Sequence, residues 1–312
     1  MSLQAAKMTP PVNGTMPPVA LAKRRWGAPM NQPIQNWQGR RVWLVGASSG
    51  IGLALAKHAA AQGMNVVLAD IDEAALLAAT EQLNLPADRV LALRIDVRHA
   101  AEIKSLADAA YSKFNAVHLL FNNAGVALAR TTWEHTVADW EWVLQVNLWS
   151  VVHGISEFLP RMQAQGGAAH IVNTASVAGL VSNPGMAAYN VSKHGVVTLS
   201  ETLSLELQMT QSTVGVSLLC PAWVPTGIGN SERNRPSDVA QTMPIEGFSA
   251  QLNKRIGKAI ASGQLTADDM AVETFNAISE NRFYVIPHSY MFPVIETRMQ
   301  EILGQQNPTL PK

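Results

Sequence analysis

The feature that most constrains the fold of this chain is a glycine-rich turn between a short apolar strand and a helix. Arg41–Val45 is rich in β-branched and aromatic residues, and Gly46-Ala-Ser-Ser-Gly50-Ile-Gly52 follows at once, before an alanine-rich stretch over 53–62. In such a unit the first glycine permits the tight turn, the second lets the backbone approach a pyrophosphate, and the third lets helix and strand pack closely. The turn favours a nucleotide site, although tight turns without any chemistry use the same residues.

Apolar runs recur along the rest of the chain and alternate with helical stretches. The predicted strands cover 42–45, 66–69, 90–95, 119–122, 169–174, 214–219 and 284–286. This alternation predicts an α/β fold: a single Rossmann-like domain with a doubly wound parallel sheet and helices on both faces. Ligands of such sheets bind beyond the carboxyl ends of the strands. Five polar or turn-forming residues are placed there by the pattern: Asp70, Asp96, Asn123, Ser176 and Pro221.

Asp70 ends the second predicted strand, 18 residues after Gly52. A dinucleotide-binding fold places an acidic residue at this point, against the hydroxyls of the adenosine ribose. Its charge would repel the 2′-phosphate of NADP, and Ile71 supplies no cation, so we expect NAD rather than NADP. The alternative is that Asp70 or Asp72 caps the helix expected to begin near Glu73, and capping is the preferred interpretation for Asp72.

Tyr189 and Lys193 lie four residues apart in the stretch Ala-Tyr-Asn-Val-Ser-Lys, so on a helix they share one face. A nearby ammonium favours the ionised form of a phenol, whose unperturbed pKa is about 10. A base poised near neutral pH would need a shift of about three units, or about 4 kcal/mol. The spacing alone is weak evidence for an acid/base pair, because it also arises by chance.

These motifs together resemble the short-chain dehydrogenase/reductase family, and the resemblance covers nearly all of the chain from Arg41 to about Leu303. The matching segments occur in the family's order: Gly46 to Gly52, Asp96-Val97, Asn122-Asn-Ala-Gly125, Asn147, Ser176, Tyr189-x3-Lys193 and Pro221-x2-Val224-x-Thr226. Two positions depart from the family pattern. Val45 replaces a threonine whose hydroxyl steadies the glycine turn, and Ala222 replaces the glycine after Pro221.

The resemblance implies an oxidoreductase that transfers a hydride between a nicotinamide cofactor and a secondary alcohol or its ketone. It implies that Tyr189 exchanges a proton with the substrate oxygen, while Lys193 lowers the pKa of that tyrosine and holds the nicotinamide ribose. Ser176 would stabilise charge on the substrate oxygen, and Asn147 would hold a water that links Lys193 to solvent. The alternatives are that Ser176 only caps a turn and that Asn147 makes only a local helix hydrogen bond.

The expected cofactor-binding residues come from the glycine turn, the strand ends and the acid/base pair. They are Gly46, Ser48, Ser49, Gly50, Ile51, Gly52, Asp70, Asp96, Val97, Asn123, Ala124, Gly125, Tyr189, Lys193, Pro221, Val224 and Thr226. Two other functions stay open: an NADP-dependent carbonyl reductase, and a nucleotide-sensing protein of the same fold without turnover. The complete set of Ser176, Tyr189 and Lys193 argues against a pure sensor, which needs no acid/base group.

Several segments outside these motifs bear on the substrate. Residues 227–263 show no strand pattern and are expected to form a substrate lid, whose apolar residues favour a fairly apolar substrate but can equally pack on the core. Trp223 is a candidate for substrate contact. Four tryptophans surround Asn147, and Trp142 and Trp149, seven residues apart, are predicted to share a helix face. Helix packing or a subunit interface is favoured for them over an aromatic substrate wall.

Composition limits the classes of partner. The 312 residues include 23 basic and 23 acidic side chains, which gives no electrostatic reason to expect nucleic acid or an anionic membrane as partner, so a small uncharged substrate fits better. The single Cys220 excludes an internal disulfide, and we expect a buried, inert thiol and a reducing, cytoplasmic location. The histidines show no grouping typical of a metal site. No apolar run of about 18 residues predicts a transmembrane helix.

The ends of the chain differ in character. Residues 1–38 hold six of the 17 prolines and no sustained periodicity, so a flexible, proline-rich tail is expected there and the dehydrogenase domain over 39–312. Lys23-Arg-Arg25 is not followed by the apolar stretch of a twin-arginine export signal. Thr266-Ala-Asp-Asp269 predicts a capped helix start. The family resemblance also implies a homodimer or homotetramer.

Overall fold

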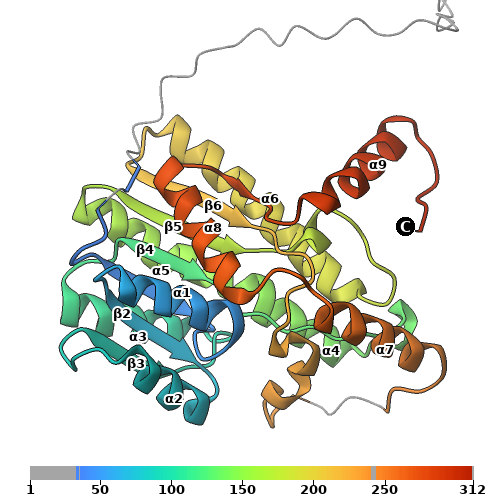
Figure 1. The fold of residues 1–312 in the computed structure, drawn as a ribbon, viewed down its shortest axis with the longest axis horizontal. Helices are drawn as coiled ribbons and strands as arrows, with labels where there is room; N and C mark the ends of the chain where they lie inside the picture. The colour runs from blue at the N-terminus through green and yellow to red at the C-terminus, as the bar shows by residue number, and fades with distance from the viewer. Residues whose placement is uncertain (1–32, 35, 240–243, 311–312) are drawn as a thin grey trace, which may run out of the picture.

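A parallel β-sheet covered by helices on both faces forms the centre of the protein (Figure 1), seen in a computed structural model that describes residues 33–34, 36–239 and 244–310. Within these residues, seven strands pair in the order β3-β2-β1-β4-β5-β6-β7, and every pair is parallel. The chain proceeds from β1 outward to β3 and then returns to place β4 on the other side of β1. The predicted doubly wound α/β fold is therefore confirmed.

The strand bounds lie close to those expected from the apolar runs. The strands are β1 (Arg41–Val45), β2 (Asn65–Asp70), β3 (Val90–Arg94), β4 (Leu119–Asn122), β5 (Ala169–Thr174), β6 (Val214–Leu219) and β7 (Tyr284–Val285). Both β5 and β6 are buried along their whole length; β6 is mostly apolar, whereas β5 also contains the buried polar residues His170, Asn173 and Thr174.

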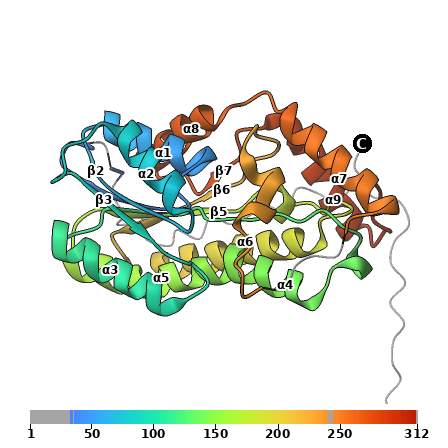
Figure 2. The same ribbon diagram turned by 90° about the horizontal axis from the view of Figure 1, so that it is seen from below.

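The helices form two layers around the sheet (Figure 2). One layer contains α1 (Gly50–Ala61), α2 (Glu73–Leu83) and α8 (Ala267–Glu280), and the other contains α3 (Ala100–Phe114), α4 (Val137–Leu144), α5 (Ser150–Gln165) and α6 (Ala187–Met209). Beyond the sheet lie α7 (Gly247–Ala261) and α9 (Phe292–Leu303). Shorter helical segments are η1 (Thr132–Glu134), η2 (Gln145–Trp149), η3 (Val177–Gly179), η4 (Gly227–Asn234) and η5 (Ser289–Met291).

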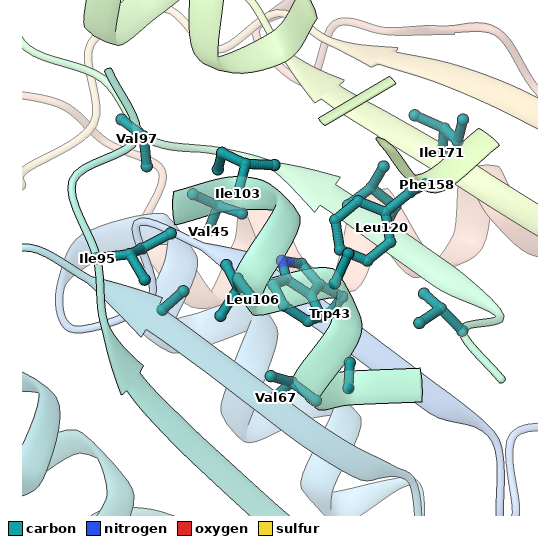
Figure 3. Packing of buried hydrophobic residues seen from close by; sticks show 14 of the residues in the cluster. Trp43, Val45, Val67, Ile95, Val97, Ile103, Leu106, Leu120, Phe158 and Ile171 are labelled. Atoms are coloured by element: carbon teal, nitrogen blue, oxygen red, sulfur yellow. The ribbon is translucent and has the colours of Figure 1, made fainter. Parts of the chain in front are cut away.

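The first strand shows how the sheet divides the core. Trp43 and Val45 point into the layer formed with α3 and α5, whereas Val42 and Leu44 point into the layer formed with α1 and α8, because successive side chains of a strand face opposite sides. The Trp43 ring packs 4.6 Å from the ring of Phe158 (Figure 3). Both layers are well filled, so the strand ends that carry the site are held rigidly.

Two helix starts confirm the predicted caps. Asp72 precedes α2, and its carboxylate accepts a hydrogen bond from the amide of Ala75 at 3.0 Å. Thr266 precedes α8 and forms a reciprocal capping box with Asp269. Each acceptor satisfies amides that have no partner inside the helix.

Two residues that the sequence assigned to the tail belong to the packed fold. Ile34 is 2% exposed and lies in the core layer of α1 and α8. Trp37 packs edge-on against Phe275 of α8, with ring centroids 5.2 Å apart. Packed residues therefore occur before the expected boundary at residue 38, because Ile34 is buried in this core layer and Trp37 packs against Phe275. The remainder of the expected tail, residues 1–32 and 35, lies outside the described residues.

The segment that carries Asn147 is not a regular α-helix. Its residues, Gln145–Trp149, form a π-helix between α4 and α5, in which the amide of Ser150 bonds to the carbonyl of Gln145, five residues earlier. The wider turn rotates the residues that follow, so Trp142 is 1% exposed while Trp149 is 51% exposed. The expectation that these two tryptophans share a helix face was wrong.

The described helices and the described acidic, cysteine and histidine side chains bear on the classes of partner. None of the helices in 33–34, 36–239 and 244–310 is long and apolar enough to cross a membrane. Within the same ranges, no three His, Cys, Asp or Glu side chains are grouped so that they could hold a metal ion. Cys220 is fully buried, which confirms the expected environment of the thiol.

Candidate active site

A cleft lies at the carboxyl ends of the central strands, where the direction of winding changes between β1 and β4. Doubly wound sheets bind their ligands at such switch points. Most of the predicted site residues line this cleft: Gly46, Ser49, Gly50, Ile51, Asp70, Asp96, Val97, Asn123, Ala124, Gly125, Ser176, Tyr189, Lys193, Pro221, Val224 and Thr226. Three predicted residues are not among the lining residues: Ser48, Gly52 and Asn147. Each of them contacts a residue that lines the cleft, as described below.

The glycine turn forms a narrow backbone cradle. Gly46 and Gly50 have positive φ angles of +70° and +53°, a conformation that suits glycine. A Cβ atom on Gly46 would lie 2.7 Å from the Cα of Ala124, and one on Gly52 would lie 1.9 Å from the carbonyl oxygen of Gly46. The turn is therefore closed against its neighbours and presents the amino end of α1 to the cleft, which suits an anion such as a pyrophosphate.

Asp70 performs two tasks at the end of β2. One carboxylate oxygen, Oδ2, accepts hydrogen bonds from the amide and the hydroxyl of Ser48 at 3.0 and 2.7 Å. The other, Oδ1, accepts the amide of Asp72 at 3.2 Å. Asp70 thus ties the glycine turn to β2 while it also faces the cleft. This tie steadies the turn, in which Val45 lacks the family's threonine hydroxyl.

A chain of hydrogen bonds joins Lys193 to the glycine turn. The ammonium of Lys193 donates to the carbonyl oxygen of Thr174 at 2.7 Å. The hydroxyl of Thr174 donates to Oδ1 of Asn123 at 3.1 Å, and Nδ2 of Asn123 donates to the carbonyl of Gly46 at 3.0 Å. Sequence reasoning missed Thr174, although its place at the end of a predicted strand was a usable signal.

Asn147 holds the loop that follows β4. Its side-chain oxygen accepts the amide of Val126 at 2.8 Å, and its Nδ2 donates to the carbonyl of Val126 at 2.9 Å and to the hydroxyl of Ser192 at 3.0 Å. The alternative of a local helix bond is therefore wrong for this side chain. A Cβ on Gly125 would lie 3.6 Å from both the Asn147 side-chain oxygen and the Lys193 nitrogen. Both polar groups therefore lie next to Gly125.

Tyr189 and Lys193 lie on one face of α6, as predicted, and the Lys193 nitrogen is 5.7 Å from the centre of the Tyr189 ring. Ser176 follows β5 and lines the cleft together with Tyr189. Its hydroxyl also accepts the amide of Ala178 and donates to the carbonyl of Pro221, at 3.1 and 3.2 Å. Ser176 therefore caps a turn, as one alternative held, and faces the tyrosine at the same time.

Burial acts on the two ionisable groups in opposite directions. It raises the pKa of Tyr189 to about 12, against the smaller lowering effect of the Ser176 hydrogen bond, and it lowers the pKa of Lys193 to about 8. Burial therefore dominates the pKa of Tyr189, and the Lys193 ammonium bonds to Thr174, so the expected lowering of the tyrosine pKa by Lys193 stays a prediction. At neutral pH the phenol is protonated and the lysine is charged. A protonated phenol is a proton donor, as the reduction of a carbonyl requires.

Part of the wall of this cleft is apolar. The apolar part includes Trp142, Val146, Met186, Trp223, Ile228 and Ile260. Trp223 therefore lines the cleft, and its contact with substrate stays a prediction. Trp142 both packs in the core and lines the cleft, so the preferred interpretation of helix packing was incomplete. Met186 and Ile260 were missed because neither belongs to a motif.

The opposite end of the cleft contains an ion pair that sequence reasoning also missed. Asp96 follows β3, and its carboxylate is held by the guanidinium of Arg98, with 2.6 Å between Nη2 and Oδ2. The hydrogen bond to Asp96 raises the pKa of Arg98, so the arginine stays charged. Arg98 lines the cleft beside Asp96 and Val97.

A doubly wound sheet with a glycine cradle at one end of the cleft and a tyrosine, lysine and serine at the other defines an oxidoreductase that binds a nicotinamide nucleotide. The chain belongs to the short chain dehydrogenase family, whose profile matches residues 40–237.

Individual relatives extend this match over most of the chain. A short chain dehydrogenase/reductase from Burkholderia phymatum, crystallised in complex with NAD, is 44% identical, with a TM-score of 0.87 over 89% of this chain and 99% of that chain. A CLA biosynthesis dehydrogenase/reductase of Lactiplantibacillus plantarum is 32% identical over 277 residues, which are 88% of this chain and 97% of that protein. A cyclohexanol dehydrogenase of Acinetobacter sp. (strain SE19) is 35% identical over 179 residues, 57% of this chain and 71% of that protein.

Proposed function

We propose that this protein interconverts a secondary alcohol and its ketone with NAD, and that the substrate is fairly apolar. One observation carries the proposal: the cleft that holds Tyr189, Lys193 and Ser176 at one end presents a glycine cradle and Asp70 at the other. The cradle fits a dinucleotide because its turn admits no side chain at Gly46 or Gly52 and faces the amino end of α1.

The chain's own residues supply the proton chemistry. A bound nicotinamide would give or take the hydride. In the direction of reduction, Tyr189 donates its phenolic proton to the oxygen of the substrate as negative charge develops there. The Ser176 hydroxyl, beside the tyrosine, donates a hydrogen bond to the same oxygen and stabilises that charge. The buried Lys193 cation stabilises the phenolate that remains, and Asn147 keeps the Gly125 loop in place next to Lys193.

The choice of NAD rests on the charge at the end of β2. Asp70 faces the cleft, Ile71 lines it beside Asp70, and neither offers a positive group to a 2′-phosphate. The relative from Burkholderia phymatum, with 44% identity, was crystallised with NAD, which supports the same choice. The alternative, an NADP-dependent carbonyl reductase, would require a cation from elsewhere to offset Asp70.

The nature of the substrate follows from the apolar part of the cleft wall. Trp142, Met186, Trp223 and Ile260 contribute apolar surface to the cleft that also contains Tyr189. An apolar ring or chain would bury its surface there, at about 25 cal/mol per Å². The resemblance to a cyclohexanol dehydrogenase supports an uncharged alcohol of this kind. The segment 227–263, which contains η4 and α7, is proposed as the lid, since Ile228 and Ile260 belong to the wall.

An oligomer is proposed from the surface of the molecule. Trp149, Leu205 and Met209 are exposed by 51%, 61% and 73%, and two of them lie on the long helix α6. Large apolar side chains in such numbers on one helix layer favour contact with another subunit. A homodimer or homotetramer would cover them.

A turnover screen of cyclic and open-chain secondary alcohols and their ketones, with each nucleotide, tests the proposal, and Tyr189→Phe tests the assignment of the proton donor. We expect turnover of apolar substrates with NAD or NADH. The Tyr189→Phe variant should lose about 100-fold or more of kcat, because the donor is removed, while its affinity for NADH stays within about twofold. Wild-type kcat in this variant would exclude Tyr189 as the donor. NADH binding without turnover of any substrate would favour a sensor.

A further inference from the structure

Residues 227–239 are here called the strap. The strap follows β6 in the chain and reaches the residues after β3, the strand at one edge of the sheet, where Asp238 bonds to Arg98. The strap begins next to Thr226, whose Cγ2 would lie 3.2 Å from a Cβ on Gly50. Its residues Gly227, Ile228, Ser231, Arg233, Asn234 and Pro236 line the same cleft as the glycine turn. The strap therefore passes over the carboxyl ends of the central strands, where the nucleotide proposed above would lie.

The strap is attached firmly on the side of α4. The hydroxyl of Ser231 accepts the amide of Ala127 at 2.9 Å, and Ser231 is 3% exposed. The guanidinium of Arg235 bonds to Asp139 of α4 at 2.8 Å and lies 4.3 Å from the centre of the Trp142 ring. Both members of this ion pair are buried, with side-chain exposures of 5% and 0%. These contacts make the first part of the strap a fixed wall.

The other end of the strap has an exposed attachment. Asp238 accepts two hydrogen bonds from Arg98, with 3.0 Å between Nη2 and Oδ1 and 3.2 Å between Nη1 and Oδ2. The Arg98 side chain is 6% exposed, whereas that of Asp238 is 64% exposed. Arg98 is fixed by its bonds to Asp96, so the arginine is the rigid partner and Asp238 is the partner that water can replace.

We propose that the pair Arg98–Asp238 is a latch that retains the nucleotide, and that the two residues are positioning residues for its residence in the cleft. The latch joins the two halves of the sheet above the adenosine end, because Arg98 follows β3 and Asp238 belongs to the segment after β6. A dinucleotide that lies along the glycine turn leaves only when this end of the strap lifts. The buried contacts of Arg235 stay in place during that movement. This inference rests on the proposed use of NAD.

The test measures release of NADH from the full-length protein. The protein is loaded with NADH, excess NAD is added in a stopped-flow instrument, and the loss of NADH fluorescence gives the release rate. We expect Asp238→Asn to release NADH about threefold faster than the wild type, since an exposed ion pair contributes modestly. Salt should speed release from the wild type and have little effect on the variant, because ions screen exposed charges. The matched control is Asp108→Asn, whose carboxylate pairs with Arg161 at 2.8 Å away from the cleft.

The Arg98→Met background shows whether the two residues act as a pair. Arg98→Met by itself releases Asp96 as well, so its own effect is expected to be larger. If the latch acts through Arg98, adding Asp238→Asn to Arg98→Met changes the release rate no further. If Asp238→Asn released NADH at the wild-type rate, the latch would be overturned while NAD would remain the proposed cofactor. The same conclusion would follow if Asp238→Asn accelerated release equally in the wild type and in Arg98→Met. A wild-type protein that does not bind NADH would overturn the latch and the proposed cofactor together.

Discussion

Tyr189 and Lys193 show how one buried environment sets two protonation states. Burial disfavours the charged form of any group, so it raises the pKa of the phenol and lowers the pKa of the ammonium group. With pKa values of about 12 and about 8, the pair at neutral pH consists of a neutral proton donor and a cation. The Thr174 carbonyl accepts a direct hydrogen bond from the Lys193 ammonium, and Ser176 lines the cleft beside the pair.

The pKa of Lys193 predicts a pH limit on ketone reduction. The lysine is charged below about pH 8 and neutral above it, while the tyrosine keeps its proton throughout this range. We expect kcat/KM for reduction to be level below about pH 8 and to fall above it. The Lys193→Met variant should be slower and bind NADH more weakly, and its pH profile should lack this limb. Should the variant show the same fall, another group would be responsible.

Asp70 gives a prediction on cofactor choice that the hydrogen bonds of the site sharpen. Because Asp70 also holds Ser48, a change that removes its acceptor would disturb the glycine turn. Asp70→Asn keeps an acceptor and removes the charge, so it is the cleaner variant. Combined with Ile71→Arg it should shift the ratio of NADPH to NADH affinity toward NADPH by about tenfold or more. Titrations of both nucleotides at one salt concentration measure the ratio of the two affinities. Asp70→Ala is the control, since it removes both the charge and the acceptor that holds Ser48.

Among the elements, the strand–turn–helix unit of β1 and α1 carries the strictest steric demand. We expect Gly52→Ala to abolish nucleotide binding, because its Cβ would meet the carbonyl of Gly46 at 1.9 Å and displace the turn. Gly257→Ala, in the middle of α7, is the matched control, since a Cβ there meets nothing within 4 Å. That control should bind normally and gain about 0.5–1 kcal/mol in free energy of unfolding. Isothermal titration with NADH and urea unfolding separate the two effects, and normal binding by Gly52→Ala would contradict the cradle.

The elements also show what the sequence could predict. The strands and the caps at Asp72 and Thr266 follow from local patterns, and the structure places them within one or two residues of expectation. The π-helix around Asn147 was not predicted from local patterns, and the side chain of Asn147 is bonded to Val126, 21 residues earlier. The pair of Arg98 and Asp238 joins residues 140 apart, and neither lies in a motif. Motifs located the cleft, whereas contacts distant in sequence completed its walls.

At the scale of the whole molecule, a buried histidine makes stability depend on pH. His170 lies in β5, and its Nε2 bonds to the hydroxyl of Ser217, which in turn donates to the carbonyl of Arg282. Burial lowers the pKa of His170 to about 3, compared with about 6.5 in an unfolded chain. As pH falls, the unfolded chain takes up the proton first. The contribution of His170 to stability is therefore complete above about pH 6.5 and is lost progressively down to about pH 3.

We expect the wild type to lose about 2 kcal/mol of unfolding free energy between pH 7 and pH 5 through this residue alone. His170→Gln keeps a donor for Ser217 and does not titrate in this range. Its loss over the same interval should be smaller than that of the wild type by about that amount. Urea unfolding of both proteins at the two pH values gives the comparison. Equal losses would mean that the protonation of His170 is not linked to unfolding.

The burial of Ile34 in the core and the contact of Trp37 with α8 bear on how shortened versions of this protein should be made. A fragment that starts where the family match starts, at residue 40, would discard both side chains and uncover Phe275, which is only 3% exposed in the intact chain. This loss of packing would destabilise α8. Because α8 packs against α1, it would also affect α1, which presents its amino end to the nucleotide. Fusion tags and cleavage sites should therefore be placed upstream of Pro33, where they leave the packing of Ile34 and Trp37 intact.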